Sequence, residues 1–167
     1  MDKFLVPDAS PLIALQKLSL IHLFFECSTK NGWKIIITRP VYIEIIKPPE
    51  LKEVVEEKIS KGEIVLVNNY DPEILTLAFP SLGPGEASIL LLSQDDPYMR
   101  NKTILIIDDK LARSIANNNG CNLTGTIGII NALKKRGYLS AEKTEWIKKT
   151  LPSIIYCSPE LVKELDE

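Results

Sequence analysis

Short apolar runs alternate with longer segments of helical spacing along most of the chain, and this alternation limits the fold more than any other feature. The runs that we expect to form strands are residues 3–6, 33–37, 64–67, 103–107 and 122–124. They are mostly continuous in their apolar character, which is typical of a parallel sheet covered on both faces. With right-handed crossovers, the sequence predicts an α/β fold: a three-layer α/β/α sandwich with a central parallel sheet of four to five strands.

Capping residues mark where several of the intervening helices are expected to begin. Ser10 precedes a proline, a combination that favours the first turn of a helix, and Ser19 is in position to cap a second helix. Either Asp108 or Asp109 is expected to cap the helix after the fourth apolar run. Residues 94–101 are predicted to form an exposed turn.

The three cysteines, Cys27, Cys121 and Cys157, are far apart and include no Cys-x-x-Cys pair. A zinc or disulfide framework is therefore not expected, and the thiols are interpreted as small packed groups in a reducing compartment. The longest apolar runs are too short to span a bilayer, and the N-terminal residues contain no long apolar segment. We therefore predict a cytoplasmic protein without a membrane partner.

Chain length and net charge exclude few functions. The chain has 167 residues, the usual size of one domain, and a formal net charge of −2. No global basic field therefore attracts nucleic acid or a membrane surface, which counts mildly against RNA binding. RNA binding is still compatible with this charge, because a bound metal pair would add about four positive charges to an acidic pocket.

Acidic residues follow two of the predicted strands. Asp8 comes directly after the first run, and Asp108 and Asp109 come directly after the fourth. In open α/β sheets, ligands bind in the crevice at the carboxyl ends of the strands. If these two strands are neighbours, the three carboxylates converge in one crevice.

Two further acids lie in apolar helical surroundings. Glu44 is flanked by isoleucines, and Glu86 opens a very apolar helix. An acid on an apolar face is costly unless it is paired, protonated or bound to a metal. Because the chain has one histidine, an oxygen-only cluster would suit Mg²⁺ or Mn²⁺ better than Zn²⁺. One or two such ions could activate a water for attack on a phosphodiester.

Each of these residues also has a purely structural interpretation. Asp8 could be a turn acid, Asp108 or Asp109 a helix cap, and Glu86 a charge at the positive end of its helix. Lys110 and Arg113 follow the acid pair by about one turn and could contact an RNA backbone, or they could lie on a solvated face. The spacing alone leaves these alternatives open.

Five segments taken in order resemble PIN domains. They are VPDASPLI at 6–13, PVYIEI at 40–45, GPGEA at 83–87, IIDDKLAR at 106–113 and TGTIG at 124–128. The first is similar to the subfamily that opens with Asp-Ala-Ser-Pro-Leu-Ile. The resemblance runs from about Phe4 to Tyr138. It implies a PIN-like nuclease domain over residues 1–138, with residues 139–167 as a C-terminal helical extension packed on the same domain.

The resemblance implies a ribonuclease that depends on Mg²⁺ or Mn²⁺. Many PIN-domain proteins resembling VapC are toxins inhibited by a small antitoxin protein, and they commonly form homodimers. The implied catalytic residues are Asp8, Glu44, Glu86 and Asp109. The implied metal ligands are Asp8, Glu86, Asp108 and Asp109.

Ser10 and Thr126 are the implied supporting polar groups, the latter from the segment after the last core strand. The sequence departs from the toxins in two ways. Its third acid, Glu86, is glutamate where many toxins have aspartate, and the fourth motif lacks their downstream Asp-Phe.

Two other functions are compatible with the same residues. A catalytically inactive PIN-type module would bind RNA or a protein partner without turnover. A metal-dependent phosphatase acting on a small molecule would normally carry Asp-x-Asp at the first strand. Here Ser10 follows Asp8 by two positions, which argues against a phosphatase.

Overall fold

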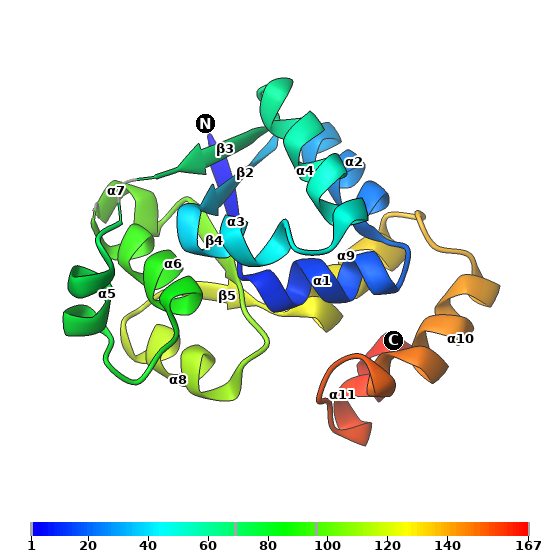
Figure 1. Cartoon of the computed structure of the whole chain (residues 1–167). Coiled ribbons are helices and arrows are strands. Elements are labelled where there is room, and N and C mark those ends of the chain that lie inside the picture. Colours follow the sequence, from blue (N-terminus) through cyan, green and yellow to red (C-terminus); the bar gives the residue numbers. More distant parts are fainter. Residues whose placement is uncertain (1, 69, 96, 167) are drawn as a thin grey trace.

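Five parallel strands form one sheet at the centre of the molecule (Figure 1). The computed structural model describes residues 2–68, 70–95 and 97–166. The strands occur in the order β3-β2-β1-β4-β5. Their bounds are β1 Lys3–Pro7, β2 Trp33–Thr38, β3 Ile64–Val67, β4 Thr103–Ile106 and β5 Asn122–Thr124. Together with the helices on both faces, this sheet confirms the predicted three-layer α/β/α sandwich.

Helices cover both faces of the sheet because successive strands are added first toward one edge and then toward the other. The first two crossovers step from β1 to β2 to β3, and the next two step the other way, from β3 to β4 to β5. Right-handed crossovers in opposite directions place their helices on opposite faces. The first group is α1 Ala9–Lys17, α2 Ile21–Lys30, α3 Arg39–Ile45 and α4 Pro49–Ser60. The second group is α5 Pro72–Ala78, α6 Pro84–Asp95, α7 Pro97–Arg100 and α8 Lys110–Asn118.

The last core helix, α9 Thr126–Lys135, returns to the first face, where it contacts α1 and α2. The C-terminal elements follow it at one corner of the molecule (Figure 1): α10 Ala141–Thr150, η1 Leu151–Ser153, α11 Pro159–Lys163 and η2 Glu164–Asp166. Leu151 and Leu165 are fully buried, and Lys134 on α9 donates a hydrogen bond to the Leu165 carbonyl. These contacts attach the C-terminal elements to α9. None of the helices in the described part of the chain is long and apolar enough to cross a membrane.

The register of the central strands brings their carboxyl ends level. Pro7 at the end of β1 pairs with Ile106 at the end of β4, and the Asp8 amide donates to the Ile106 carbonyl at 2.9 Å. Both strands are buried near this end, because Val6 and Ile106 are inaccessible to solvent. The residues directly after the two strands are therefore neighbours.

Three local predictions differ from the structure. Helix α1 begins at Ala9 with Asp8 as its cap, two residues before the predicted cap Ser10, because the Asp8 carboxylate accepts the Ala9 amide. Helix α2 is preceded by Leu20 without a side-chain cap, since Ser19 takes a left-handed conformation with φ of 57°. The predicted turn at 94–101 contains the end of α6 and the short helix α7, apart from residue 96, which lies outside the described residues.

Candidate active site

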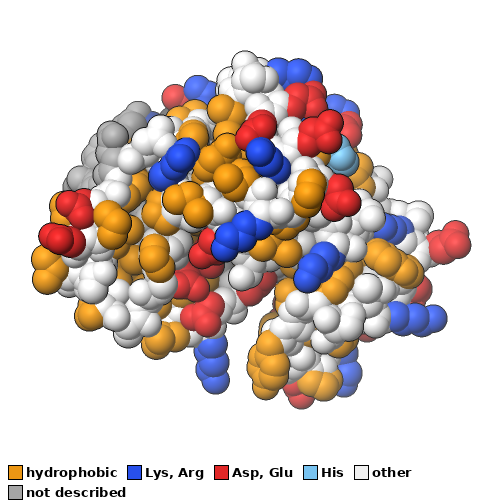
Figure 2. All heavy atoms as spheres, in the orientation of Figure 1, with side chains coloured by type: hydrophobic (Ala, Val, Ile, Leu, Met, Phe, Trp, Pro, Cys, Tyr) orange, Lys and Arg blue, Asp and Glu red, His pale blue; other side chains and the backbone are white. Residues whose placement is uncertain are grey.

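The acids after β1 and β4 meet at the carboxyl edge of the sheet, together with acids from α3 and α6. The charges of Glu86, Glu44 and Asp108 all act on Asp8, and those of Asp109 and Glu44 act on Glu86. Figure 2 shows acidic side chains beside the hollow between this end of the sheet and the C-terminal helices. The tertiary structure thus brings the five predicted acids into one electrostatic neighbourhood.

Asp8 is the most deeply buried of these acids, with 5% of its surface exposed. Its Oδ1 atom accepts the Ala9 amide at 2.8 Å, which fixes the carboxylate at the start of α1. The pKa of Asp8 is raised from 3.8 to about 7: burial raises it most, the Ala9 bond lowers it, and the charges of Glu86, Glu44 and Asp108 also raise it. Such a group is stable as an anion only beside a positive charge that offsets its burial.

Gly85 leaves room beside two of the carboxylates. A Cβ atom at this position would lie 3.2 Å from Asp8 Oδ1 and 3.9 Å from Glu44 Oε1. Both oxygens therefore lie close to one point at the N-terminal turn of α6. The sequence indicated only a helix entry at this glycine, because a close approach between distant segments has no local signal. Glu44 itself lies on the exposed side of α3, next to the buried Ile45.

Helix α6, which carries Glu86, is held against the end of β2 by a buried polar contact. Thr38 and Ser88 are both inaccessible to solvent, and their hydroxyl oxygens lie 2.7 Å apart. The Ser88 hydroxyl also lies 2.7 Å from the Gly85 carbonyl, within the same helix turn. This contact links the strand before Glu44 to the helix turn that carries Glu86, and sequence reasoning missed it.

Glu86 is half-buried and takes part in capping its own helix. Its Oε2 atom accepts the Gly83 amide at 3.0 Å, as the third-position acid of a capping box does. Burial raises the pKa of Glu86, the Gly83 bond lowers it, and the charges of Asp109 and Glu44 raise it. Glu86 therefore caps its own helix, and its carboxylate also lies near the charges of Asp109 and Glu44.

The two consecutive aspartates have different surroundings. Asp109 is exposed and caps α8, with its Oδ1 atom accepting the Ala112 amide at 2.8 Å. Asp108 is half-buried, and its carboxylate accepts the Thr126 amide at 2.8 Å and the Thr126 hydroxyl at 2.5 Å. Thr126 is fully buried. The implied supporting group Thr126 thus holds Asp108 in place.

The basic candidates, Lys110 and Arg113, both belong to α8, which follows this pair. One nitrogen of the Arg113 guanidinium donates to the Ile107 carbonyl at 2.7 Å. A Cβ atom on Gly125 would lie 2.7 Å from Asp108 Oδ1 and 3.2 Å from the same Arg113 nitrogen, so the guanidinium lies beside the Asp108 carboxylate. Lys110 and Ser10 are exposed at the starts of α8 and α1.

The donor chemistry fits a hard divalent cation, since every acid offers carboxylate oxygens and the charges disfavour one another. In the described residues, however, no three acidic, histidine or cysteine side chains lie close enough to hold one ion. In this arrangement one oxygen of Glu86 and one of Asp109 accept backbone amides at the helix starts.

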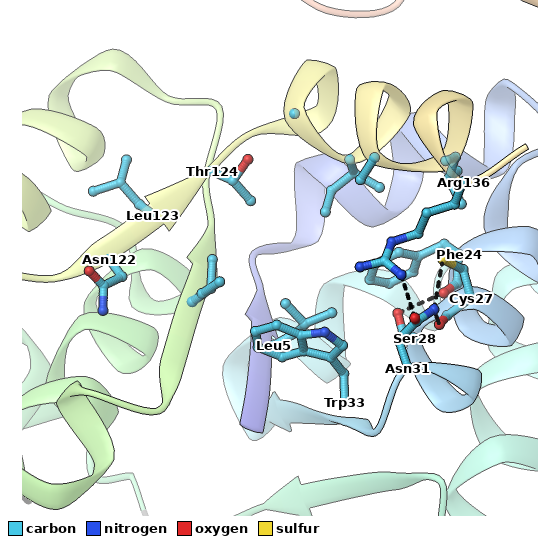
Figure 3. A pocket seen from close by; sticks show the side chains of 15 residues that line it. Leu5, Phe24, Cys27, Ser28, Asn31, Trp33, Asn122, Leu123, Thr124 and Arg136 are labelled. Carbon is cyan, nitrogen blue, oxygen red and sulfur yellow. Dashed lines mark hydrogen bonds between the residues drawn. The ribbon is translucent and has the colours of Figure 1, made fainter. Parts of the chain in front are cut away.

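A cavity in the described part of the chain lies away from these acids. It measures about 380 Å³ and lies between α2, α9 and the strands (Figure 3). Its walls include Leu5, Phe24, Leu123 and Leu133 and none of the five acids. A smaller pocket of about 240 Å³ includes Asp108. We assign the candidate site to the acids, because the walls of this cavity are mostly apolar and include no carboxylate that could hold a metal ion.

Comparison with known proteins agrees with the fold. A model of the family DUF3368, described as a PIN domain, matches residues 4–166. The match covers the C-terminal helices and so extends beyond Tyr138, where the similarity of the sequence motifs ended. No curated protein matches the chain significantly.

Proposed function

Because the chain belongs to the PIN-domain family, whose members are generally nucleases that use divalent metal ions, we propose that it is an Mg²⁺- or Mn²⁺-dependent ribonuclease. The observation that carries the proposal is the buried Asp8 carboxylate, whose pKa of about 7 reflects both burial and the acids around it. Perturbed carboxylates at the carboxyl ends of parallel strands are expected of a functional site.

The proposed catalytic residues are Asp8, Glu44, Glu86 and Asp109, and the proposed metal ligands are Asp8, Glu86, Asp108 and Asp109. When bound, a divalent ion would supply the charge that makes this group of acids stable and would activate a water for attack on the RNA phosphodiester. The protein itself contributes hydrogen bonds that hold oxygens of Asp8, Glu86, Asp108 and Asp109 in place.

Three contacts support this division of roles. The Ala9 amide orients Asp8, Thr126 orients Asp108, and the missing side chain of Gly85 keeps space beside Asp8. Arg113, next to Asp108, is placed to contact an RNA phosphate with the donors that Ile107 does not use. Lys110 could add a second contact from the exposed start of α8, and Ser10 could support the site from α1.

A second candidate function is a catalytically inactive module that binds RNA or a protein partner. It is favoured by the capping bonds of Glu86 and Asp109, which keep these carboxylates from converging in the described arrangement. A nuclease would have to exchange at least part of this capping for metal ligation. The inactive module would instead form complexes without turnover at any concentration of Mn²⁺.

We further propose that the protein is the toxin of a toxin–antitoxin pair and acts in the cytoplasm as a homodimer. The support is the resemblance of its first motif, residues 6–13, to VapC-like proteins. Free thiols at Cys27, Cys121 and Cys157 are compatible with a reducing compartment. A small neighbouring gene whose product binds this chain and suppresses RNA cleavage would be the expected antitoxin.

The experiment that tests the nuclease compares two substitutions at opposite ends of one strand. Asp8→Asn removes a charge at the buried carboxyl end of β1, and Asp2→Asn removes one at its exposed amino end. Asp8→Asn is expected to lower the rate of RNA cleavage in Mn²⁺ by at least about 100-fold and to weaken Mn²⁺ binding in calorimetry. Asp2→Asn should change neither. Equal cleavage by wild type and Asp8→Asn would exclude this mechanism.

A further inference from the structure

The smaller pocket, which we call the C-terminal pocket, joins the candidate active site to the C-terminal segment. Its volume is about 240 Å³. Its lining includes Asp108 and Arg113 on the side of the acids, and Tyr156, Cys157, Leu161 and Glu164 on the C-terminal segment. Burial and then the charge of Asp108 raise the pKa of the Cys157 thiol, which agrees with the segment lying against the acids.

The mouth of the C-terminal pocket carries an unusually exposed aromatic side chain. Tyr156 belongs to the lining, yet its side chain is fully exposed at 101%. Leu161, from the same segment, is 41% exposed. A ring and an aliphatic side chain left in water beside a pocket form a surface on which a flat, partly apolar group can stack.

The polar groups of this pocket are few and of both signs. Arg113 uses one guanidinium nitrogen on the Ile107 carbonyl, which leaves other N–H donors of its five for an anion. Glu164 is exposed and offers a carboxylate acceptor. Asp108 is engaged by Thr126, so its oxygens are less available to a ligand. The pocket therefore combines apolar walls, one phosphate-binding cation and one acceptor.

The size of the pocket limits the ligand. Pockets for drug-sized molecules have volumes of roughly 300–1,000 Å³, and this one is smaller. A single planar ring system with one anionic neighbour matches both the volume and the chemistry. An unpaired nucleotide of RNA has this composition, because proteins read single-stranded RNA by stacking on splayed bases and by bonding to their edges.

We propose that the C-terminal pocket receives one unpaired base of the RNA strand, next to the phosphodiester that lies at the acids. Tyr156 stacks on the base, Arg113 contacts the adjoining phosphate, and Glu164 accepts a hydrogen bond from an exocyclic amino group. The proposal rests on the proposed ribonuclease function and adds to it: the C-terminal segment selects where the strand is cut.

The stacking role is tested with Tyr156→Ala and Tyr156→Phe, using the full chain without metal so that RNA is bound and not cut. The probe is a fluorescently labelled single-stranded oligocytidylate, and the measurement is its Kd by anisotropy. Tyr156→Ala is expected to raise Kd by about 5- to 150-fold, the equivalent of one lost base stack. Tyr156→Phe, which keeps the ring, should bind within about twofold of wild type. Leu77→Ala, which removes an exposed apolar side chain on α5, is the control and should leave Kd unchanged.

The acceptor role is tested by comparing oligocytidylate with oligouridylate, since uracil lacks an exocyclic amino group. Wild type should bind the cytidylate more tightly, and Glu164→Gln should reduce this preference. Equal affinity of wild type for both oligomers would contradict the role of Glu164.

The possible results distinguish failure of the base-binding proposal from failure of the proposed ribonuclease function. If Asp8→Asn abolishes cleavage while Tyr156→Ala binds RNA as well as wild type, the nuclease stands and the base pocket is wrong. The same result is expected if the pocket serves a protein partner instead. If wild type neither binds nor cuts RNA, both proposals fail together. Equal losses in Tyr156→Ala and Tyr156→Phe would rule out stacking.

Discussion

Two regions beside the sheet have opposite character: the group of acids at its carboxyl edge and the apolar cavity of Figure 3. In the apolar cavity, the polar groups are paired: Ser28 donates to the Phe24 carbonyl at 2.7 Å, and Arg136 donates to Asn31 across the gap between α9 and α2. At the acids, Asp8 is buried among like charges and its pKa is raised to about 7. The apolar cavity thus includes no acidic side chain, whereas the acids at the carboxyl edge of the sheet repel one another.

This difference indicates that charge, more than volume, marks the functional region. An apolar cavity lowers stability modestly through lost packing contacts. Buried acids lower it through desolvation and repulsion, a cost that a bound cation would offset. Removing apolar atoms from the cavity wall should therefore lower stability without changing activity, whereas neutralising the buried acid Asp8 should raise stability and abolish activity.

The largest effect is expected from Leu133→Ala in the wall of the apolar cavity. Leu133 is 1% exposed, so its truncation enlarges an existing hollow and should cost about 2–5 kcal/mol of unfolding free energy. RNA cleavage per folded molecule should not change. Urea denaturation and a cleavage assay at matched folded concentration provide the measurement. A large loss of activity per folded molecule would show that the cavity and the acids are not independent.

Asp8→Asn should have the opposite effect on stability, and only at higher pH. Without metal, native Asp8 has a pKa of about 7 against the usual 3.8 of an aspartate in the unfolded chain, so the native state binds more protons between these values. Wild-type stability should therefore fall as pH rises from about 4 to 7, by up to about 4 kcal/mol from this group.

The Asn variant lacks this titration, so it should be the more stable protein at pH 8 and gain little at pH 4. Urea denaturation at both pH values measures the difference. A wild type that gains stability relative to Asp8→Asn on going from pH 4 to pH 8 would show that Asp8 is not disfavoured as an anion.

Thr126→Val should lower stability in the acidic region by removing one hydrogen bond to a carboxylate. The substitution keeps the shape of a fully buried side chain but removes the hydroxyl that donates to Asp108 at 2.5 Å. A hydrogen bond to a charged group contributes about 1.5–3 kcal/mol, which is the expected loss in thermal or urea unfolding. Thr76→Val on exposed α5, where the hydroxyl donates only to the Pro72 carbonyl, is the matched control. Equal effects of the two substitutions would mean that Asp108 does not depend on Thr126.

The smallest effect is expected from filling the apolar cavity. Ala132 on α9 lines it, and Ala132→Leu adds apolar volume without touching any of the acids. Cavity-filling changes commonly stabilise by about 0.5–2 kcal/mol, so the melting temperature should rise by a few degrees for a chain of this length. Cleavage should remain at the wild-type rate. A lower melting temperature would indicate that the cavity cannot accept the added atoms.

Much of the fold could be predicted because its signals are local. The continuous apolar runs located all five strands to within about a residue, and Pro or Gly residues marked most helix boundaries. The predictions failed where a distant contact or an unusual backbone decided the result. Ser19 could not cap α2 in its left-handed conformation, and the capping role fell to Asp8 instead of Ser10 at α1.

By itself, the sequence determined the number and order of strands along the chain, the alternation with helices, and the presence of acids directly after two strands. These features depend on residue types at short spacing, which is all that a linear pattern records. Only the tertiary structure decided that β1 and β4 are neighbours, that Asp8 is buried while Glu44 is exposed, and that Thr126 holds Asp108. Burial, pKa and hydrogen bonding arise from contacts between segments far apart in the chain, so they exist only once the sheet has formed.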